Sequence, residues 1–485
     1  MNNISKLNPE IIWKHFYSLT QIPRQSKSET QIRAFLADFG KGLGLETIVD
    51  EIGNVIIRKP ATPGMENRMG IVLQGHMDMV PQKNSDKKHD FTTDPIETYI
   101  DGEWVTANGT TLGADNGMGV AAAMAILESK DLQHGPIEML VTTDEETGMT
   151  GANSLKPGVL KGDILMNLDS EDEGELYVGC AGGVDANIFF DFEHEEVPEG
   201  SVAYELLVSG LKGGHSGMDI VLGRGNANKL LFRFMKEAET NFDMRLASVA
   251  GGGLRNAIPR EAKAIVILPA GMKNAFLDSL GAWTEVFKKE LAATEPGLSF
   301  VAKETAMPAV LIDEDTQWAL INAVYACPNG VIRMSDSMPG LVETSTNLAS
   351  VISDANQIKI QCLLRSSVDS AKEDLASMIA SVFELAGAEC SFTGAYPGWK
   401  PNMESAILKV MQEVYNNRFG KIPEIKAIHA GLECGILGGS YPNWDMISFG
   451  PTIRYPHSPD EKVLIASVEK FWIFLTETLK NVPVK

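Results

Sequence analysis

The chain is organised around the segment IEMLVTTDEETG, which runs from Ile137 to Gly148. Its first half is an apolar run of strand length, and its second half is a glycine-containing turn with two adjacent carboxylates, Glu145 and Glu146. Open α/β sheets present their sites at the carboxyl ends of their strands. We therefore predict a buried strand that brings one glutamate to a metal ion and the other to a water molecule. A solvated surface turn is the alternative for such a pair taken alone, because most carboxylates are exposed.

Length and composition describe a globular protein with more than one domain. The chain has 485 residues, which exceeds one ordinary core and predicts two or three domains. Hydrophobic residues make up 44% and charged residues 22% of the chain, as in soluble globular proteins. The net charge of −22 opposes binding to phosphate backbones and anionic lipid, so we expect no nucleic-acid and no membrane partner.

The cysteines and the N-terminus indicate a reducing compartment. Five cysteines, an odd number without a CxxC pair, argue against a disulfide framework. We interpret all five as small buried hydrophobic residues. No apolar segment follows a basic start at the N-terminus, and no run approaches the roughly 18 apolar residues of a membrane span. The expected location is the cytoplasm.

Three short apolar strands in the first part of the chain each lead into polar residues. They are Ile71–Gln74, Ile137–Thr143 and Ile164–Leu168, and helices or long loops separate them. The helix predicted over Met118–Glu128 consists of small and apolar residues, which allow it to lie close against a sheet. This βαβ pattern predicts an α/β fold with a mixed, mostly parallel sheet and helices on both faces. A hairpin is predicted around Gly53.

From about residue 185 the pattern changes to an alternation of strands and helices that is typical of an α+β layer. It persists to a Pro/Gly-rich linker, YPGWKP, at Tyr396–Pro401. We therefore predict a discontinuous domain, residues 1–184 and 399–485, with an inserted α+β domain, residues 185–398. Within the insert a hairpin followed by a helix occurs twice, which suggests two strand–helix–hairpin–helix–strand units lying back to back.

A histidine and an aspartate follow the first of the three strands. In an extended segment residues i and i+2 point to the same side, so His76 and Asp78 can act together. One can bind a metal ion while the other accepts the second ring N–H and fixes the tautomer. An ordinary turn is the alternative for this short motif.

Three further candidate ligands lie in loops. Asp115 stands at the start of a predicted helix, where a helix cap is the alternative role; Asp169 ends the third strand; and His457 lies in a proline-flanked loop. With the first histidine and one glutamate of the pair, they give two imidazoles and three carboxylates, a set that suits zinc, cobalt or manganese. One bridging carboxylate, with one histidine and one further carboxylate for each ion, predicts a two-metal site and leaves the other glutamate as a general base.

Eight motifs carry a resemblance that runs nearly end to end. They are GHMD (75–78), TLGADNG (111–117), DEETG (144–148), NLDSE (167–171), PHSPDE (456–461), GLKGGHSG (210–217), LRNAIPREA (254–262) and HAGLECG (429–435). The first five, which follow one another along the chain as given, resemble the dinuclear zinc peptidases of the aminoacylase and carboxypeptidase G type. Within that superfamily the chain is similar to the aminoacyl-histidine dipeptidase branch, the cytosol non-specific dipeptidases.

The resemblance implies roles for the residues of the two-metal site. Asp78 would orient the histidine before it, and Glu145 would take a proton from the metal-bridging water and deliver it to the leaving amine. Two zinc ions are implied, with cobalt or manganese as substitutes. The implied ligands are His76, Asp115 and Asp169 for one ion, and Asp115, Glu146 and His457 for the other.

The resemblance also implies roles for the inserted domain, which in such enzymes is a lid and often the surface of a homodimer. His215 would reach the tetrahedral intermediate, in relatives sometimes across the dimer. Asn256, Arg365 and Gly431 would hold the termini of the substrate. A guanidinium is suited to a free carboxylate, although a surface position is the alternative for Arg365.

The activity expected from the resemblance is hydrolysis of unblocked dipeptides, including Xaa-His. An aminoacylase-like N-acyl amino acid amidohydrolase is the close alternative, and a non-catalytic metal-binding protein is the distant one, which retention of Glu145 disfavours. Two features depart from the branch. Arg454 and Tyr455 precede His457 where smaller residues are expected, and they could narrow a side-chain pocket. The insert is also near twice as long as a simple lid; if it is duplicated, activity would not need a dimer.

Overall fold

A computed structural model describes residues 4–485 of the chain as two compact units. The first unit comprises the residues up to Cys180 together with Trp399–Ala427 and Leu432–Lys485, and the second comprises Ala181–Gly398 and Ile428–Gly431. The boundary predicted after residue 184 falls inside strand β9 (Gly182–Asp191), because two glycines that suggest a loop are strand residues here. Between residues 4 and 485 no helix is long and apolar enough to cross a membrane.

The first unit is built on an eight-stranded sheet with a parallel centre. The four central strands are, in order, β6 (Ile137–Thr142), β3 (Ile71–His76), β7 (Ile164–Asn167) and β23 (Asp445–Ser448). Every residue of the first three is buried, which explains why their sequences are almost continuously apolar. The predicted hairpin, β1 (Glu46–Val49) and β2 (Val55–Lys59), adds antiparallel strands beside β6. The opposite edge is formed by β8 (Glu175–Cys180) and β22 (Glu424–Ile428).

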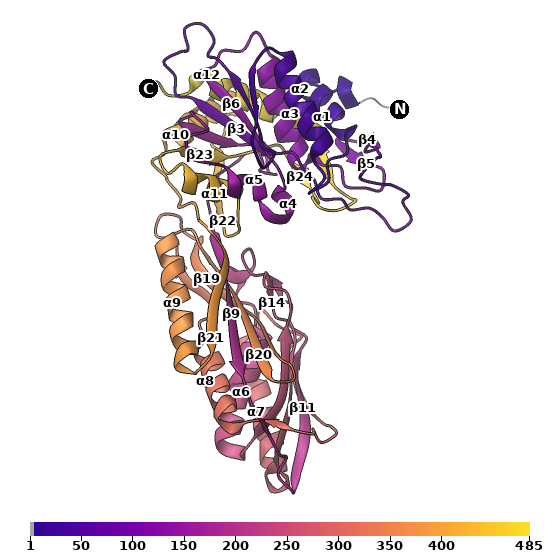
Figure 1. Cartoon of the computed structure of the whole chain (residues 1–485), viewed down its shortest axis with the longest axis vertical. Coiled ribbons are helices and arrows are strands. Elements are labelled where there is room, and N and C mark those ends of the chain that lie inside the picture. The colour runs from indigo at the N-terminus through magenta and orange to yellow at the C-terminus, as the bar shows by residue number, and fades with distance from the viewer. Residues whose placement is uncertain (1–3) are drawn as a thin grey trace. The chain divides into compact units, whose positions relative to one another are not determined.

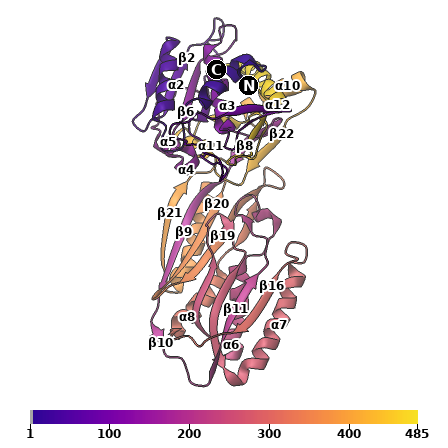
Figure 2. The same ribbon diagram turned by 90° about the vertical axis from the view of Figure 1, so that its right-hand side faces the viewer.

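Helices cover this sheet on both sides, as Figures 1 and 2 show. The helix α3 (Ala114–Glu128) connects β3 to β6, and α5 (Thr150–Ser154) connects β6 to β7. These connections run in opposite directions along the sheet, so right-handed crossovers place the two helices on opposite faces. The prediction of a mostly parallel sheet with helices is thereby confirmed. The other helices are α1 (Glu10–Thr20), which packs on α3, α2 (Thr30–Gly42), α4 (Glu145–Gly148), α10 (Ala406–Phe419), α11 (Glu433–Ser440), which packs beside α5, and α12 (Ile465–Asn481).

Glycine allows α3 to approach the strand ends. A Cβ atom on Gly119 would lie 2.2 Å from the main-chain oxygen of Leu168, and one on Gly75 would lie 2.1 Å from the side-chain oxygen of Asn116. A larger residue at position 119 would require movement of the backbone, and one at position 75 would displace the side chain of Asn116. The start of α3 is therefore held directly against the ends of β3 and β7.

A small sheet joins the N-terminal and C-terminal parts of the first unit. Its order is β24 (Ile453–Arg454), β25 (Lys462–Leu464), β5 (Trp104–Ala107) and β4 (Thr98–Asp101). The pairing is antiparallel throughout. The loop between β24 and β25 carries His457, so this sheet brings a residue near the C-terminus to the same unit as the strand ends.

The second unit has a nine-stranded antiparallel sheet in which one order of elements occurs twice. Each half runs strand–helix–hairpin–helix–strand, and in each half the strands occupy the same relative positions. The halves do not lie back to back; they join edge to edge, because β13 pairs with Ser350–Ile352 of β19. The ninth strand, β18 (Gly330–Met334), pairs with the first part of β19. The first half consists of β11 (Ser201–Ser209), α6 (Ala227–Phe242), β13 (Arg245–Gly252), β15 (Ala262–Pro269), α7 (Lys273–Glu290) and β16 (Ser299–Glu304), and the second of β9, α8 (Glu314–Ala326), β19 (Val342–Ser353), β20 (Gln357–Ser366), α9 (Asp369–Leu385) and β21 (Glu389–Tyr396).

The core of the second unit lies between this sheet and its helices. Phe232, Phe234, Phe276 and Phe383 are fully buried there among aliphatic side chains from both halves. All five cysteines are free. Four of them are buried, as predicted, but Cys390 is only partly buried, so the prediction is wrong for that residue.

Candidate metal centre

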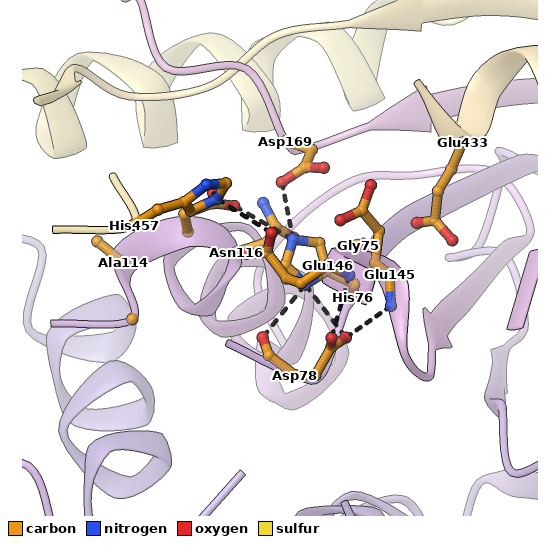
Figure 3. A network of polar contacts seen from close by, with 12 residues as sticks. Gly75, His76, Asp78, Ala114, Asn116, Glu145, Glu146, Asp169, Glu433 and His457 are labelled. Carbon is orange, nitrogen blue, oxygen red and sulfur yellow. Dashed lines mark hydrogen bonds and ion pairs between the residues drawn. The ribbon is translucent and has the colours of Figure 1, made fainter. Parts of the chain in front are cut away.

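The candidate site lies where three of the four central strands of the first unit, β6, β3 and β7, end. His76 is the last residue of β3, Glu145 begins α4 shortly after β6, and Asp169 follows β7 by two residues. These strands are neighbours and parallel, so their carboxyl ends meet at one edge of the sheet. Figure 3 shows the side chains converging from these ends.

Five side chains form two groups that share one carboxylate. His76, Asp115 and Asp169 each offer a ligand atom within 4.8 Å of the others, and so do Asp115, Glu146 and His457. Asp115 is shared by its two oxygens: Oδ1 lies 3.2 Å from Nε2 of His76, and Oδ2 lies 3.2 Å from Nε2 of His457. All five predicted ligands are therefore brought together.

The donor set fits two divalent cations. Nε2 of His76 also lies 3.4 Å from Oδ1 of Asp169, and Nε2 of His457 lies 3.0 Å from Oε2 of Glu146. Oδ1 of Asp169 and Oε1 of Glu146 are buried and have no hydrogen-bond partner. Buried carboxylate oxygens are costly unless a cation or a donor satisfies them. Imidazole and carboxylate ligands are those that zinc and manganese accept.

The histidines and carboxylates of the two groups shift one another's pKa values. Burial would lower the pKa of His76, but Asp169 and Asp115 raise it well above its ordinary value. Hydrogen bonds to Asp115 and Glu146 raise the pKa of His457 to about 11. Burial raises the pKa of Asp169 to about 7, against the opposing effect of His76.

The glycine-containing turn predicted for the paired glutamates is a single turn of helix. Glu145 and Glu146 are the first residues of α4. The cause is Asp78, which is fully buried and accepts the main-chain N–H of Glu145 at 3.0 Å and of Glu146 at 3.2 Å. A carboxylate at these free N–H groups favours a helix start. The two side chains diverge because consecutive residues of a helix point in different directions.

The contact between Asp78 and His76 runs through the backbone as well as the carboxylate. Nδ1 of His76 lies 3.2 Å from the main-chain oxygen of Asp78 and 3.5 Å from its Oδ1. Burial would raise the pKa of Asp78, but His76 and the N–H of Glu145 lower it to about 2. The carboxylate is thus ionised, and its shortest main-chain contacts are to the start of α4.

Residues 72–481 match the peptidase family M20/M25/M40. The chain belongs to this family. It is 47% identical over 485 residues to the cytosol non-specific dipeptidase of Escherichia coli K12, with all of both chains covered. It is 50% identical to the aminoacylhistidine dipeptidase of Vibrio alginolyticus, whose crystal structure matches with a TM-score of 0.96 over 99% of this chain and 98% of that one. The aminopeptidase PepT of Bacillus cereus shares the fold, with a TM-score of 0.58 at 16% identity over 98% of this chain and 99% of that one. The resemblance drawn from the motifs is confirmed.

The remaining predicted residues of this M20 peptidase belong to its second unit. His215 lies in β12 (Gly214–His215), which pairs with β14 (Ala257–Ile258). Nδ1 of His215 accepts the main-chain N–H groups of Gly217 at 3.2 Å and Met218 at 3.0 Å. Burial and then Arg365 lower its pKa, so the ring is neutral at pH 7. Its proton must therefore lie on Nε2, which makes that atom a hydrogen-bond donor.

Arg365 and Gly431 lie against the same tyrosine. Arg365 is buried and donates from Nη1 to the hydroxyl of Tyr396 at 3.3 Å, so the alternative of a surface arginine is wrong. A Cβ atom on Gly431 would lie 3.1 Å from the ring of Tyr396. The side chain of Asn256 is exposed, while its main-chain oxygen accepts the N–H of Ser216 at 2.8 Å. His429 is buried nearby on the second unit, with Nε2 2.7 Å from Oγ of Ser345.

Of the two bulky residues before His457, Arg454 binds another loop and Tyr455 is exposed. Arg454 forms an ion pair with Asp172 at 2.7 Å and donates to the main-chain oxygen of Glu171 at 3.1 Å. The Tyr455 side chain is 60% exposed. The guanidinium of Arg454 therefore binds the loop at residues 171–172.

The sequence patterns did not predict the burial of several charged residues of this M20 peptidase, among them Arg24, Glu433 and Glu461. Glu433 accepts Nε2 of Gln74 at 2.6 Å and Oγ1 of Thr142 at 2.8 Å, and Figure 3 shows its carboxylate next to that of Glu145. Burial raises the pKa of Glu433 to about 8. Burial also raises the pKa of Glu461 to about 7, although the main-chain N–H of Gly113 opposes this. An acid in the first turn of a helix or in a loop is ordinarily exposed, so no local pattern signals such burial.

Proposed function

We propose that this M20 peptidase is a dipeptidase that hydrolyses the peptide bond of unblocked dipeptides, Xaa-His included, in the cytoplasm. The observation that carries the proposal is the sharing of Asp115 between two groups of three ligands, with Glu145 beside them. The dipeptidases of Escherichia coli and Vibrio alginolyticus match the chain along its whole length, which favours a dipeptidase over an aminoacylase. The five free cysteines support a reducing compartment.

Two zinc ions are proposed as cofactors, with cobalt or manganese as substitutes. His76 and Asp169 would hold one ion, Glu146 and His457 the other, and Asp115 both. When bound, two such ions polarise the scissile carbonyl and lower the pKa of the attacking water. The peptide bond to be cleaved would then lie at the carboxyl ends of β6, β3 and β7.

Glu145 acts as the general base. It takes a proton from the attacking water and delivers it to the leaving amine, which must depart as a neutral amine. Burial raises the pKa of Glu145 well above its ordinary value, and Glu433 adds to this while His76 opposes it. A base works best when its pKa lies near the operating pH, so a buried glutamate is suited to this task. Asp78 holds the backbone from which Glu145 projects.

The second unit is proposed to act as a lid that supplies the groups for binding. The Nε2–H of His215 would donate to the oxygen that becomes negative in the tetrahedral intermediate. Arg365 would bind the terminal carboxylate of the dipeptide, since its planar fork matches two oxygens. Asn256 and Gly431 would contact the substrate's backbone and termini. The inserted domain proposed for these roles spans residues 185–398.

We also propose a homodimer formed through the lid. The two halves of the second unit already repeat one order of elements, so we expect each chain to be active without its partner. Light scattering after gel filtration measures the molar mass of the assembly in solution. Specific activity measured at decreasing enzyme concentration tests whether the separate chains are active. Specific activity that falls in step with dissociation would contradict independence of the chains.

The test of function combines a substrate panel with a variant. Xaa-His, β-alanyl-His and Cys-Gly dipeptides should be hydrolysed, whereas N-acetyl amino acids should not; cleavage of only the acylated set would sink the proposal. Glu145→Ala should keep two metal ions, by elemental analysis, and lose hydrolysis. Retained turnover would remove Glu145 from the role of base.

A further inference from the structure

The loop before α3 carries the carboxylate that both groups of ligands share. Its backbone is held by Glu461, whose side chain is buried. Oε2 of Glu461 accepts the main-chain N–H of Leu112 at 2.8 Å and of Gly113 at 2.9 Å. Oε1 accepts the N–H of Ala114 at 2.7 Å and of Asp115 at 3.2 Å. One carboxylate thus binds four consecutive N–H groups, as anions do in backbone concavities.

Arg24 holds the other side of the same loop. Its guanidinium is buried and donates from Nη2 to the main-chain oxygen of Gly113. Nη1 donates to the main-chain oxygens of Met77 at 3.1 Å and Asp78 at 3.0 Å. Arg24 therefore ties the loop of the shared ligand to the residues that follow His76. Gly113 has a φ of 69°, and a Cβ atom there would lie 2.5 Å from Nη2, so the close approach needs glycine.

The position of this backbone decides whether both groups of ligands are complete. The two oxygens of Asp115 lie at equal distances of 3.2 Å from His76 and His457, which belong to different groups. A movement of the loop that favours one histidine must draw the carboxylate from the other. Glu461 stands four residues after His457 in the loop between β24 and β25. One loop therefore supplies a ligand of the second group and fixes the backbone of the shared ligand.

We propose that Glu461, together with Arg24, is a positioning residue that holds Asp115 midway between the two cation positions, so that both are formed at once. This inference rests on the proposed function, because it presupposes two cations. Glu461 touches neither substrate nor cation; it acts through the backbone of residues 112–115. Its loss should weaken the second position most, because the histidine of the first, His76, is 1% exposed, whereas the histidine of the second, His457, is 52% exposed and less firmly held.

The test uses Glu461→Gln, which keeps the size of the side chain but replaces one acceptor oxygen by an NH₂ group that faces N–H donors. Asp460→Asn is the matched control, because it makes the same change of charge at an exposed neighbouring residue. Metal-free protein is titrated with Co²⁺ by calorimetry and by visible absorption. We expect two Co²⁺ ions in the wild type and in Asp460→Asn. In Glu461→Gln the second ion should bind on the order of 10- to 100-fold more weakly, as for other residues that orient metal ligands.

The outcomes separate this inference from the proposed function. Fewer than two Co²⁺ ions in the wild type would overturn both. If the wild type binds two Co²⁺ ions and Glu461→Gln binds both with unchanged affinity, the positioning role alone is overturned. This holds even if the variant unfolds at a lower temperature. Saturating Co²⁺ should restore kcat in the variant, because the defect lies in affinity.

If Glu461→Gln does not fold, a second variant and a second measurement still test the positioning role. Arg24→Lys retains the charge but loses the fork that binds three main-chain oxygens, and it should weaken the second ion in the same way. Hydrogen exchange of the amides of residues 112–115 in the metal-free wild type should be slow, because all four donate to one buried carboxylate. Fast exchange there would contradict the proposed contact.

Discussion

Replacing Asp78 by asparagine should impair catalysis while leaving both cations bound. The carboxylate of Asp78 accepts two main-chain N–H groups at the start of α4, at 3.0 and 3.2 Å, and the hydroxyl of Ser26 at 2.8 Å. Asparagine has a single acceptor oxygen, so at least one of these N–H groups would face an NH₂ group. The direction in which Glu145 projects would no longer be fixed. The ring of His76 keeps an acceptor, because the main-chain oxygen of residue 78 remains.

The size of the effect follows from these bonds. A hydrogen bond to a charged group contributes about 1.5–3 kcal/mol, and a neutral one about 0.5–1.5 kcal/mol. Exchanging two charged bonds for one neutral bond costs about 3 kcal/mol in the positioning of α4. If the transition state bears this cost, kcat/KM falls about 100-fold, since each 1.36 kcal/mol is tenfold.

The assay is steady-state hydrolysis of a dipeptide by protein whose metal content has been measured. Ser26→Ala is the control, because it removes one hydrogen bond to the same carboxylate but leaves both bonds from Asp78 to α4. It should therefore lower kcat/KM less than Asp78→Asn does, since the direction of Glu145 stays fixed. Circular dichroism verifies that the variants are folded. The reasoning is refuted if Asp78→Asn loses a metal ion but keeps its kcat when reloaded, since Asp78 would then act through His76 and not through α4.

Three further predictions concern packing, pH and substrate binding. Gly119→Ala should lower the free energy of unfolding in urea by about 1–3 kcal/mol, because the new Cβ atom meets a main-chain oxygen. The control Gly281→Ala, in the middle of α7 where no atom lies near, should raise it by about 0.5–1 kcal/mol. Equal effects of the two substitutions would contradict the packing of α3. Burial lowers the pKa of His429 to about 3 in the folded protein, whereas the pKa of histidine in the unfolded chain is about 6.5. Between these two values only the unfolded chain binds a proton at His429. Acidification from pH 7 to pH 5 should therefore lower the free energy of unfolding by about 2 kcal/mol. In His429→Gln this loss should be absent from the urea midpoints, and an unchanged pH dependence would refute the assignment. Arg365→Lys should raise KM for free dipeptides at least tenfold, by steady-state kinetics, with a smaller change in kcat, and the reverse pattern would argue against carboxylate binding.

The strands of the first unit could be predicted because burial on both faces leaves a continuous apolar sequence. Ile71–Gln74 and Ile137–Thr143 are such runs, and the structure extends or shortens them by no more than two residues. The five side chains that the motifs single out as ligands are the ones that the structure gathers. Local sequence was sufficient because each of them lies at the end of an element that the pattern locates.

The rest depends on contacts between distant segments, which no local pattern encodes. The sequence predicts a turn at Glu145 and Glu146 but not its helical form, because the carboxylate that binds its first N–H groups is that of Asp78, 67 residues earlier. Glu461 reaches the loop of Asp115 across 346 residues, and Glu433 reaches Gln74 across 359. Buried charges of this kind resemble surface residues until the tertiary structure supplies their donors.

The order of strands in the second unit has a consequence for how the chain folds. The first half, β11 to β16, is continuous in sequence and can pair as soon as it is complete. The strand β9 precedes it but pairs only with β20 and β21, which end at Tyr396. At synthesis rates of about 5–20 residues per second, β9 waits roughly 10–40 s for its neighbours with both edges unpaired. Such edges invite pairing with other chains, and contacts so distant in sequence form slowly. We therefore expect the docking of β9 to limit refolding and to be the step that a chaperone would protect.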